Sequence, residues 1–221
     1  MMGSVTVIIA ALDEERSIGA AVDSAFAAGA QEVIVSDGGS RDQTVAIARS
    51  HGARVIETDA MRSRQLNRGA EAAHNDALIF LHADTTLPNG AASAVAEALK
   101  HAEFGGFRLR FANDSLKFPA MMINLRTRLT RCPWGDQAQF IRRSTFLSGG
   151  GFREIPLMED YDLAVRMKKR GRSIVLPLTV TTSGRRFIEK GVLRTALINW
   201  TIIVRWRLGT DATTLARIYR A

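Results

Sequence analysis

LIFLHADTTLP, residues Leu78–Pro88, is an apolar run that ends abruptly in a histidine and a carboxylate. An uncharged run of this length is typical of a buried strand. Parallel sheets bind ligands at the carboxyl ends of their strands, so His82 and Asp84 are candidates for contact with a ligand. Asp84 is also a candidate oxygen ligand for Mg²⁺ or Mn²⁺. Alternatively, Asp84 or Thr86 caps a helix that has Pro88 in its first turn.

Three similar strands precede this one along the chain. The four predicted strands are Val5–Ala11, Glu32–Ser36, Arg54–Glu57 and Ala77–His82, and amphipathic segments over residues 14–28, 42–51 and 62–75 separate them. This alternation predicts an α/β fold with a mostly parallel, twisted sheet flanked by helices. Acidic residues follow each strand, so we expect several carboxylates at one edge of the sheet.

The second half of the chain alternates less regularly. We predict strands over Phe104–Phe111 and Ser173–Thr182, helices over Leu116–Thr130 and Met158–Arg170, and another short strand, GDQAQFIRR (Gly135–Arg143), after a tight turn. The residues after Phe187 are predicted to be helical.

Composition limits the possible functions. A chain of 221 residues with 46% hydrophobic residues is sufficient for one domain. The single cysteine, Cys132, favours a reducing compartment, and we find no signal peptide, so we expect a cytoplasmic location. Residues 1–110 hold 10 basic and 14 acidic residues, whereas residues 111–221 hold 20 and 8. The basic second half indicates an anionic ligand or surface.

The segment VSDGGSRDQT, residues 35–44, joins a strand to a helix. Asp37 ends the strand, Gly38 allows a tight turn, and Ser40 or Asp42 can cap a helix whose amide groups favour an anion. A turn with a helix cap and no ligand explains the same residues. After the first strand the chain lacks the G-x-G-x-x-G pattern of dinucleotide-binding domains, so that class is excluded.

The segment MEDYDLAVRMKKRG, residues 158–171, places Glu159 and Asp160 at a helix start. A carboxylate there is a candidate general base for a substrate hydroxyl. The alternative is purely structural, because acidic residues at the amino end and basic residues at the carboxyl end of a helix complement its dipole.

Together, VIIAALDEERSI, VSDGGSRDQT, LHADTTLP, GDQAQFIRR, MEDYDLAVRMKKRG and SGRRF follow one another in an order that resembles the family 2 glycosyltransferases. The resemblance implies a GT-A fold and an inverting sugar transfer from a nucleoside diphosphate sugar of UDP or GDP type, with Mg²⁺ or Mn²⁺. It further implies that Asp37 holds the uracil or ribose, Asp84 meets the metal and diphosphate, and Asp160 deprotonates the acceptor.

This reading divides the single domain, residues 1–221, into a nucleotide-sugar-binding half (1–112), an acceptor and catalytic half (113–186) and a C-terminal helical segment (187–221). Asp160 and Glu159 are the candidate catalytic residues and Asp84 the candidate metal ligand. The candidate acceptor-binding residues are Trp134, Gly135, Asp136 and Gln137. The candidate donor-binding residues are Ala11, Asp13, Glu15, Asp37, Gly38, Ser40, Arg64, His82, Ala83, Asp84, Arg185 and Arg186.

Three positions depart from the family pattern. Asp13 replaces the usual Asn, Ser36 replaces the first Asp of Asp-Asp-Gly, and His82 replaces the first Asp of the D-x-D metal motif. The loss of one carboxylate leaves Asp84 and the diphosphate to hold a metal, or basic side chains such as Arg185 and Arg186 to replace it. The chain lacks the Q-x-x-R-W motif of processive synthases, which favours a single transfer.

Other functions remain as alternatives. One is a non-catalytic relative that binds a nucleotide sugar, and another is a nucleotidyltransferase, although the basic glycine-rich loop of that class is absent after the first strand. We expect no nucleic-acid partner, because no recognised binding motif is present. An apolar stripe with Trp200 between basic residues of 187–208 predicts either peripheral membrane contact near a lipid-linked acceptor, at the inner face of the membrane, or packing against the core.

Overall fold

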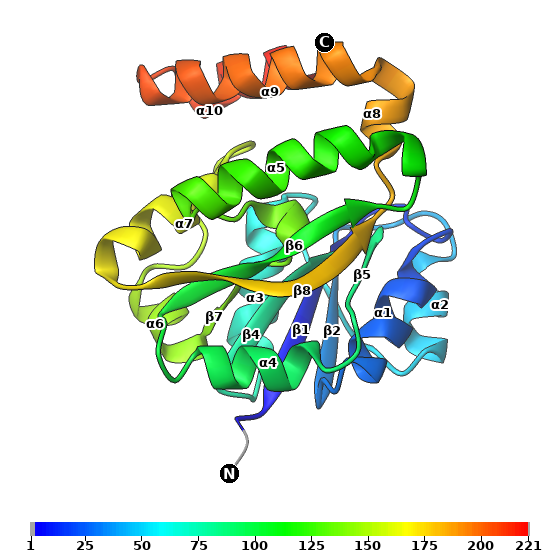
Figure 1. Ribbon diagram of the computed structural model, residues 1–221. Coiled ribbons are helices and arrows are strands. Elements are labelled where there is room, and N and C mark those ends of the chain that lie inside the picture. Colours follow the sequence, from blue (N-terminus) through cyan, green and yellow to red (C-terminus); the bar gives the residue numbers. More distant parts are fainter. Residues whose placement is uncertain (1–2, 221) are drawn as a thin grey trace.

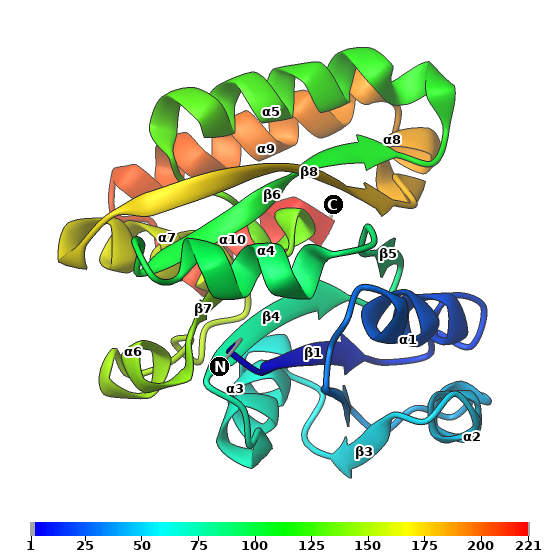
Figure 2. The same cartoon turned by 60° about the horizontal axis from the view of Figure 1, so that its bottom comes forward.

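The computed structural model describes residues 3–220 of the chain. Within these residues one eight-stranded sheet has the order β3-β2-β1-β4-β7-β6-β8-β5 (Figures 1 and 2). The strands are β1 (Val5–Ala11), β2 (Glu32–Asp37), β3 (Arg54–Glu57), β4 (Ala77–His82), β5 (Thr85–Thr86), β6 (Phe104–Phe111), β7 (Phe140–Arg142) and β8 (Ser173–Thr182). The predicted α/β fold with a mostly parallel sheet is confirmed.

Helices lie on both faces of this sheet (Figure 1). The helices are α1 (Ile18–Ala27), α2 (Thr44–Ser50), α3 (Arg62–Ala72), α4 (Ala91–Ala98), α5 (Lys117–Thr130), α6 (Arg143–Ser148), α7 (Glu159–Arg170), α8 (Arg185–Lys190), α9 (Val192–Arg207) and α10 (Ala212–Arg220). Two 3₁₀ turns, η1 (Asp114–Leu116) and η2 (Gly135–Gln137), precede α5 and β7.

The parallel strands β1, β2, β3 and β4 alternate their side chains between two cores. Val7 and Ile9 of β1 pack in the core that contains α1 and α4 residues, whereas Ile8 packs with α3, α6 and α7 residues. Successive side chains of a strand point to opposite faces, so a strand covered on both faces is apolar at nearly every position. This double burial explains why β1 and β4 read as continuous apolar runs.

The middle of the second half differs from the sequence prediction. Only Phe140–Arg142 of the expected strand at Gly135–Arg143 is extended, because η2 occupies its beginning and α6 starts at its end. The side chain of Gln137 donates to the Phe107 carbonyl oxygen at 3.0 Å, which anchors η2 against β6. β7 then pairs antiparallel with both β4 and β6, and joins the two halves of the sheet.

The C-terminal helices form a separate layer above α5 (Figure 1). Thr195 and Ile202 are the buried residues of α9, while Leu193, Leu197 and Trp200 are largely exposed. The predicted apolar stripe of this helix therefore faces outward for much of its length, and the expectation that it packs against the core is wrong for these three residues. Among residues 3–220, no helix is long and apolar enough to cross a membrane.

Helix α3 packs so closely on β1 that one position requires glycine. A Cβ atom added at Gly69 would overlap the Ile8 side chain and the Ser36 hydroxyl. Ile8 lies in the sheet and cannot move aside, so we expect Gly69→Ala to lower the free energy of unfolding by about 1–3 kcal/mol. Urea denaturation measures this change.

Gly19→Ala is the matched control, because Gly19 is also helical but a Cβ atom there would first meet the ends of the His51 and Ile47 side chains, not a residue of the sheet. There the gain in helix propensity, about 1 kcal/mol, offsets a small rearrangement. Equal destabilisation by both substitutions would contradict the tight packing of α3 on β1.

Candidate functional site

The carboxyl ends of β1, β2 and β4 lie side by side. Ala11 pairs with Asp37 across β1 and β2, and Ala10 pairs with His82 across β1 and β4. The buried Gln65 side chain of α3 donates to the carbonyl oxygens of Ala11 and Ser36, each at 2.8 Å. Gln65, which the sequence analysis missed, thus fixes two strand ends relative to each other.

Hydrogen bonds to carboxylate oxygens hold the two loops that follow β1 and β2 in place. Asp37 accepts hydrogen bonds from the Gly39 and Ser40 amides at 2.9 Å and from the Ser40 hydroxyl at 2.5 Å. Asp13 has a left-handed backbone (φ 53°) and accepts from the Arg41 amide at 2.8 Å. Glu15 accepts from the Gln43 amide at 3.1 Å. These hydrogen bonds hold the two loops together as one surface, which we call the loop wall. The Asp37 carboxylate already accepts hydrogen bonds from its own turn.

Asp84 lies beside a serine and an arginine from the opposite half of the chain. The Ser183 hydroxyl donates to Asp84 Oδ2 at 2.5 Å, and an Nη2 nitrogen of Arg185 is 3.6 Å from the same oxygen. Arg185 also donates to both carboxylate oxygens of Glu14 at 2.8 Å. The Arg185 guanidinium therefore lies between the carboxylates of Glu14 and Asp84. Ala83 is buried between the strand and Asp84.

A second group of charges surrounds Gly135. Its amide donates to Asp160 Oδ2 at 2.7 Å, and a Cβ atom at this position would overlap Arg62, His82 and Asp160. Arg62 contacts Nε2 of His82 and forms an ion pair with Glu159 at 3.2 Å. Four separate elements thus meet at one point, where α3, β4 and α7 contribute side chains and η2 contributes the Gly135 backbone amide.

Arg62 was not predicted, whereas its neighbour Arg64 was. Arg64 binds Glu154 at 2.8 Å and Asp59 at 3.1 Å, and lines a different cavity of about 760 Å³ beyond β3. A sequence signal for Arg62 did exist, since it begins the helix that follows β3, and the first turn of such a helix faces the ligand edge of the sheet.

Burial shifts the pKa values of two side chains near Gly135, His82 and Glu159. Burial first, and the Arg62 charge second, lower the pKa of His82 to about 3, so this imidazole is neutral. A guanidinium only donates hydrogen bonds, so Nε2 of His82 is the acceptor and Nδ1 carries the proton. Burial raises the pKa of Glu159, although the ion pair with Arg62 opposes this shift.

Some of the predicted acceptor-binding residues are held by contacts within the fold, and one is available to bind an acceptor. Gln137 is buried and accepts from the Thr127 hydroxyl at 2.7 Å, so it supports the turn. Trp134 stacks under the Arg126 guanidinium, 3.6 Å from its centroid, and meets Tyr161 edge-on. Asp136 Oδ1 is buried and finds no hydrogen-bond partner among residues 3–220. Asp136 is therefore the available polar group on this side.

Helices α9 and α10 close the site from the C-terminal layer. The Arg186 guanidinium lies 3.2 Å from the centroid of the Tyr219 ring and donates to the Tyr219 carbonyl oxygen at 2.7 Å. Arg207 donates twice to the Tyr161 hydroxyl, at 3.0 and 3.1 Å. The adjacent Arg185 and Arg186 therefore diverge, since the first faces Asp84 and the second is held by α10. Sequence patterns gave no indication of Tyr219.

The residues present accommodate a divalent cation in one way. Among residues 3–220, no group of three or more His, Cys, Asp and Glu residues is placed to hold a metal. Within the described residues, 3–220, Asp84 Oδ1 has one long hydrogen-bond contact, 3.4 Å from the Thr85 hydroxyl, so it is free to coordinate. Mg²⁺ commonly binds through one carboxylate together with substrate phosphates and water. Asp84 fits that mode of binding, whereas the described residues do not form a metal site made of protein ligands alone.

The raised pKa of Asp136 has a consequence for stability. Burial is the largest cause and brings this pKa to about 6, with Asp160 adding to the shift and Arg126 opposing it. The folded protein then binds more protons than the unfolded chain between about pH 4 and 6, so this contribution is present at low pH and lost as the pH rises through 6.

Asp136→Asn should therefore stabilise the protein at pH 8 relative to the parent chain, by about 1–3 kcal/mol, and by much less at pH 4. Urea denaturation of both proteins at the two pH values measures the difference. A variant with the same stability difference at both pH values would show that Asp136 is solvated.

The comparisons with known proteins agree with this architecture. The model of glycosyl transferase family 2 matches residues 6–153. No curated protein sequence matches the chain. Among solved structures, S. aureus TarS has a TM-score of 0.68 at 17% identity, over 88% of this chain but only 39% of its own. The chain thus spans less than half of that protein.

Two liganded structures also match. The TarS 1–349 complex with UDP-GlcNAc has a TM-score of 0.67 at 17% identity, over 81% of this chain and 58% of the other. The Mycobacterium tuberculosis glucosyl-3-phosphoglycerate synthase complex with Mg²⁺ and UDP has a TM-score of 0.54 at 17% identity, over 81% and 70%. These likenesses establish the fold, and the family match covers most of the chain. The chain therefore belongs to glycosyl transferase family 2.

Proposed function

We propose that the chain transfers a sugar, with inversion, from a nucleoside diphosphate sugar to an acceptor hydroxyl, with Asp160 as the general base. The observation that carries the proposal is the meeting of two groups around His82. Arg62 contacts His82 and lies with Asp160 beside Gly135, Arg185 lies beside Asp84, and both carboxylates act electrostatically on the His82 ring.

The charges suit a direct displacement at the anomeric carbon. Such a reaction needs a base for the attacking hydroxyl and positive charge near the leaving diphosphate. Arg185 supplies a fixed positive charge at the end of β4, beside Asp84. A divalent cation held by Asp84 would neutralise charge on the diphosphate in addition.

Asp160 is better placed as the base than the neighbouring carboxylates. Glu159 is buried and paired with Arg62, so we assign it the positioning of that arginine. Asp160 accepts one backbone hydrogen bond on each oxygen, from Gly135 and from Tyr161, each at 2.7 Å. A carboxylate oxygen accepts more than one hydrogen bond, so this arrangement orients Asp160 and leaves capacity for an acceptor hydroxyl.

UDP is the nucleotide that the comparisons favour. The matched TarS structure is titled as a complex with UDP-GlcNAc, and the matched synthase structure as a complex with Mg²⁺ and UDP. The wall formed by the β1–α1 and β2–α2 loops, with Asp13, Gly38 and Ser40, is the candidate surface for the nucleoside. Its carboxylates already bind backbone amides, so we expect contact through the loop backbone as well as through Asp37.

Replacing the proposed base separates catalysis from binding. Asp160→Asn keeps the shape and one of the two backbone contacts, because its amide oxygen accepts an N–H whereas its NH₂ group only donates. It removes the proton acceptor, so we expect UDP affinity to stay within about twofold while the release of UDP from UDP sugars falls by about 10²–10⁴-fold. UDP release is measured over a panel of UDP sugars, with a cell extract as the source of acceptors, and the anomeric configuration of the product is determined by NMR.

Asp23→Asn is the matched control, since Asp23 is an exposed carboxylate that pairs with His51 away from the site. Unchanged turnover in Asp160→Asn would remove Asp160 from the base role. UDP binding without turnover in the parent chain would favour the non-catalytic alternative, and a product with retained configuration would exclude a direct displacement.

A further inference from the structure

Two helices of the outer layer carry apolar side chains on their exposed faces. On α5, Phe118, Met121, Met122, Leu125 and Leu129 recur at spacings of three or four residues, with Met121 and Met122 adjacent, and all are exposed. On α9, Leu193, Leu197 and Trp200 follow the same spacing, with exposed fractions of 81%, 67% and 67%. A helix packed on a core buries such a stripe, so both helices carry a second apolar face that the fold does not use.

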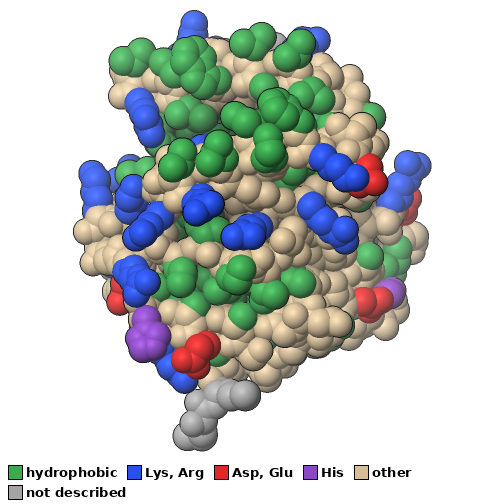
Figure 3. All heavy atoms as spheres, viewed as in Figure 1, with side chains coloured by type: hydrophobic (Ala, Val, Ile, Leu, Met, Phe, Trp, Pro, Cys, Tyr) green, Lys and Arg blue, Asp and Glu red, His purple; other side chains and the backbone are tan. Residues whose placement is uncertain are grey.

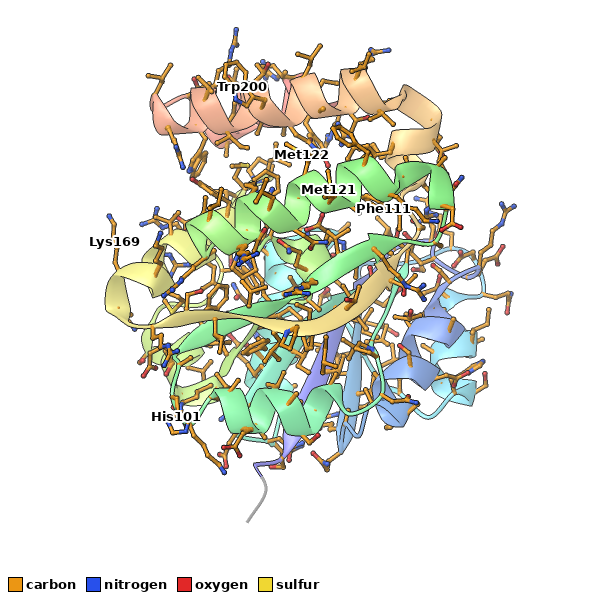
Figure 4. All side chains as sticks on the ribbon, in the orientation of Figure 1. His101, Phe111, Met121, Met122, Lys169 and Trp200 are labelled. Carbon is orange, nitrogen blue, oxygen red and sulfur yellow. The ribbon has the colours of Figure 1, made fainter. Side chains whose placement is uncertain are left out.

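The two stripes form one surface. Figures 1 and 2 both show α9 running beside α5, and Figure 3 shows the apolar side chains of the two helices gathered on the same face of the molecule. In Figure 4, Met121 and Met122 of α5 lie below Trp200 of α9. We call these eight residues the outer apolar surface. Contiguous exposed apolar patches on a protein indicate an interaction site.

Basic residues border this surface on one side. A groove of about 780 Å³ runs between α5 and β6, lined by Arg108, Arg110, Lys117 and Arg128 on its polar side and by Met121 and Leu125 on its apolar side. Figure 3 shows the corresponding row of Lys and Arg side chains beneath α5. Asp114 pairs with Lys117 at 3.2 Å and is the acidic residue of the groove lining, so the groove is strongly positive.

The outer apolar surface and the basic groove together indicate what kind of partner binds here. Apolar side chains beside a row of cations match the interface of an anionic membrane, where the apolar groups enter the acyl boundary and the cations meet phosphates. A second copy of the chain fits less well, because a symmetric contact would bring two rows of arginine together. We propose that α5, α9 and the basic groove between α5 and β6 dock the protein on an anionic lipid membrane.

The surface adjoins the reaction centre. Arg207, at the end of α9, donates to the Tyr161 hydroxyl, and Tyr161 directly follows Asp160. Membrane docking would therefore hold the acceptor side of the site close to the lipid interface. The docking surface itself does not depend on the proposed reaction, because the residues that form it are separate from Asp84 and Asp160.

Vesicle co-sedimentation tests the proposal on the full chain. We expect binding to phosphatidylcholine vesicles that contain phosphatidylglycerol, little binding to phosphatidylcholine alone, and loss of binding as NaCl is raised. Arg108→Gln, Arg110→Gln and Arg128→Gln together should weaken the binding by about 100-fold, because each cation near an anionic surface contributes roughly fivefold. Leu197→Ser with Trp200→Ser should weaken it by about tenfold or more.

Two control substitutions lie elsewhere on the surface. Arg49→Gln removes an exposed cation of α2, and Leu147→Ser removes an exposed apolar side chain of α6. Neither should change vesicle binding. Thermal unfolding with UDP checks that every variant remains folded, so a failure of docking and a failure of nucleotide binding are distinguished.

Tryptophan fluorescence measures how deeply the α9 side chains enter the bilayer. Lipids brominated on their acyl chains should quench the fluorescence of the parent chain, and this quenching should be lost in Trp200→Phe while vesicle binding persists. Equal binding to neutral and anionic vesicles, or unchanged binding by the arginine variant, would overturn the proposal. So would displacement by millimolar inorganic phosphate, which would indicate a soluble phosphate site, or a stable dimer without lipid that Trp200→Ser dissociates.

Discussion

The hydrogen bond from the Gly135 amide to Asp160 determines the arrangement of the reaction centre. It requires η2 to approach α7 so closely that no side chain fits at position 135, and the space left by the missing Cβ is filled by Arg62 and His82. Arg62 in turn holds Glu159. A bulkier residue at 135 would separate groups contributed by four elements, so the geometry of the site depends on the absence of a side chain at this position.

The chain departs from the family pattern that it resembles at His82, and this side chain is neutral. Burial beside Arg62 keeps His82 uncharged, so the position that resembles a metal-binding carboxylate carries neither a negative charge nor a positive one. The charge that a second carboxylate would bring is absent, and Arg185 stands 3.6 Å from Asp84. We propose that binding of a diphosphate at this site would depend on Arg185 as well as on a cation held by Asp84.

The sequence was sufficient to predict those features that follow from strand order. Parallel strands must bring their carboxyl ends together, so the proximity of Asp13, Asp37, His82 and Asp84 followed from the βα alternation. The sequence was insufficient to predict contacts that depend on tertiary packing. The partners of Gln65, Arg62 and Tyr219 depend on how α3 and α10 are oriented, which no local pattern records. The extended reading of Gly135–Arg143 failed for a similar reason, because Gln137 anchors a 3₁₀ turn to the distant strand β6. The outward stripe of α9 looked like a core stripe, since periodicity identifies an apolar face but not what covers it.

We propose that a nucleoside diphosphate binds between the loop wall and Asp84. Isothermal titration of UDP into the parent chain and into Asp84→Asn, each with and without Mn²⁺, distinguishes the contributions of the two sides. We expect that UDP binds the parent chain, that Mn²⁺ strengthens this binding, and that Asp84→Asn loses only the strengthening, since Arg185 remains. No binding of UDP to the parent chain, or an equal gain from Mn²⁺ in both proteins, would rule out this binding mode.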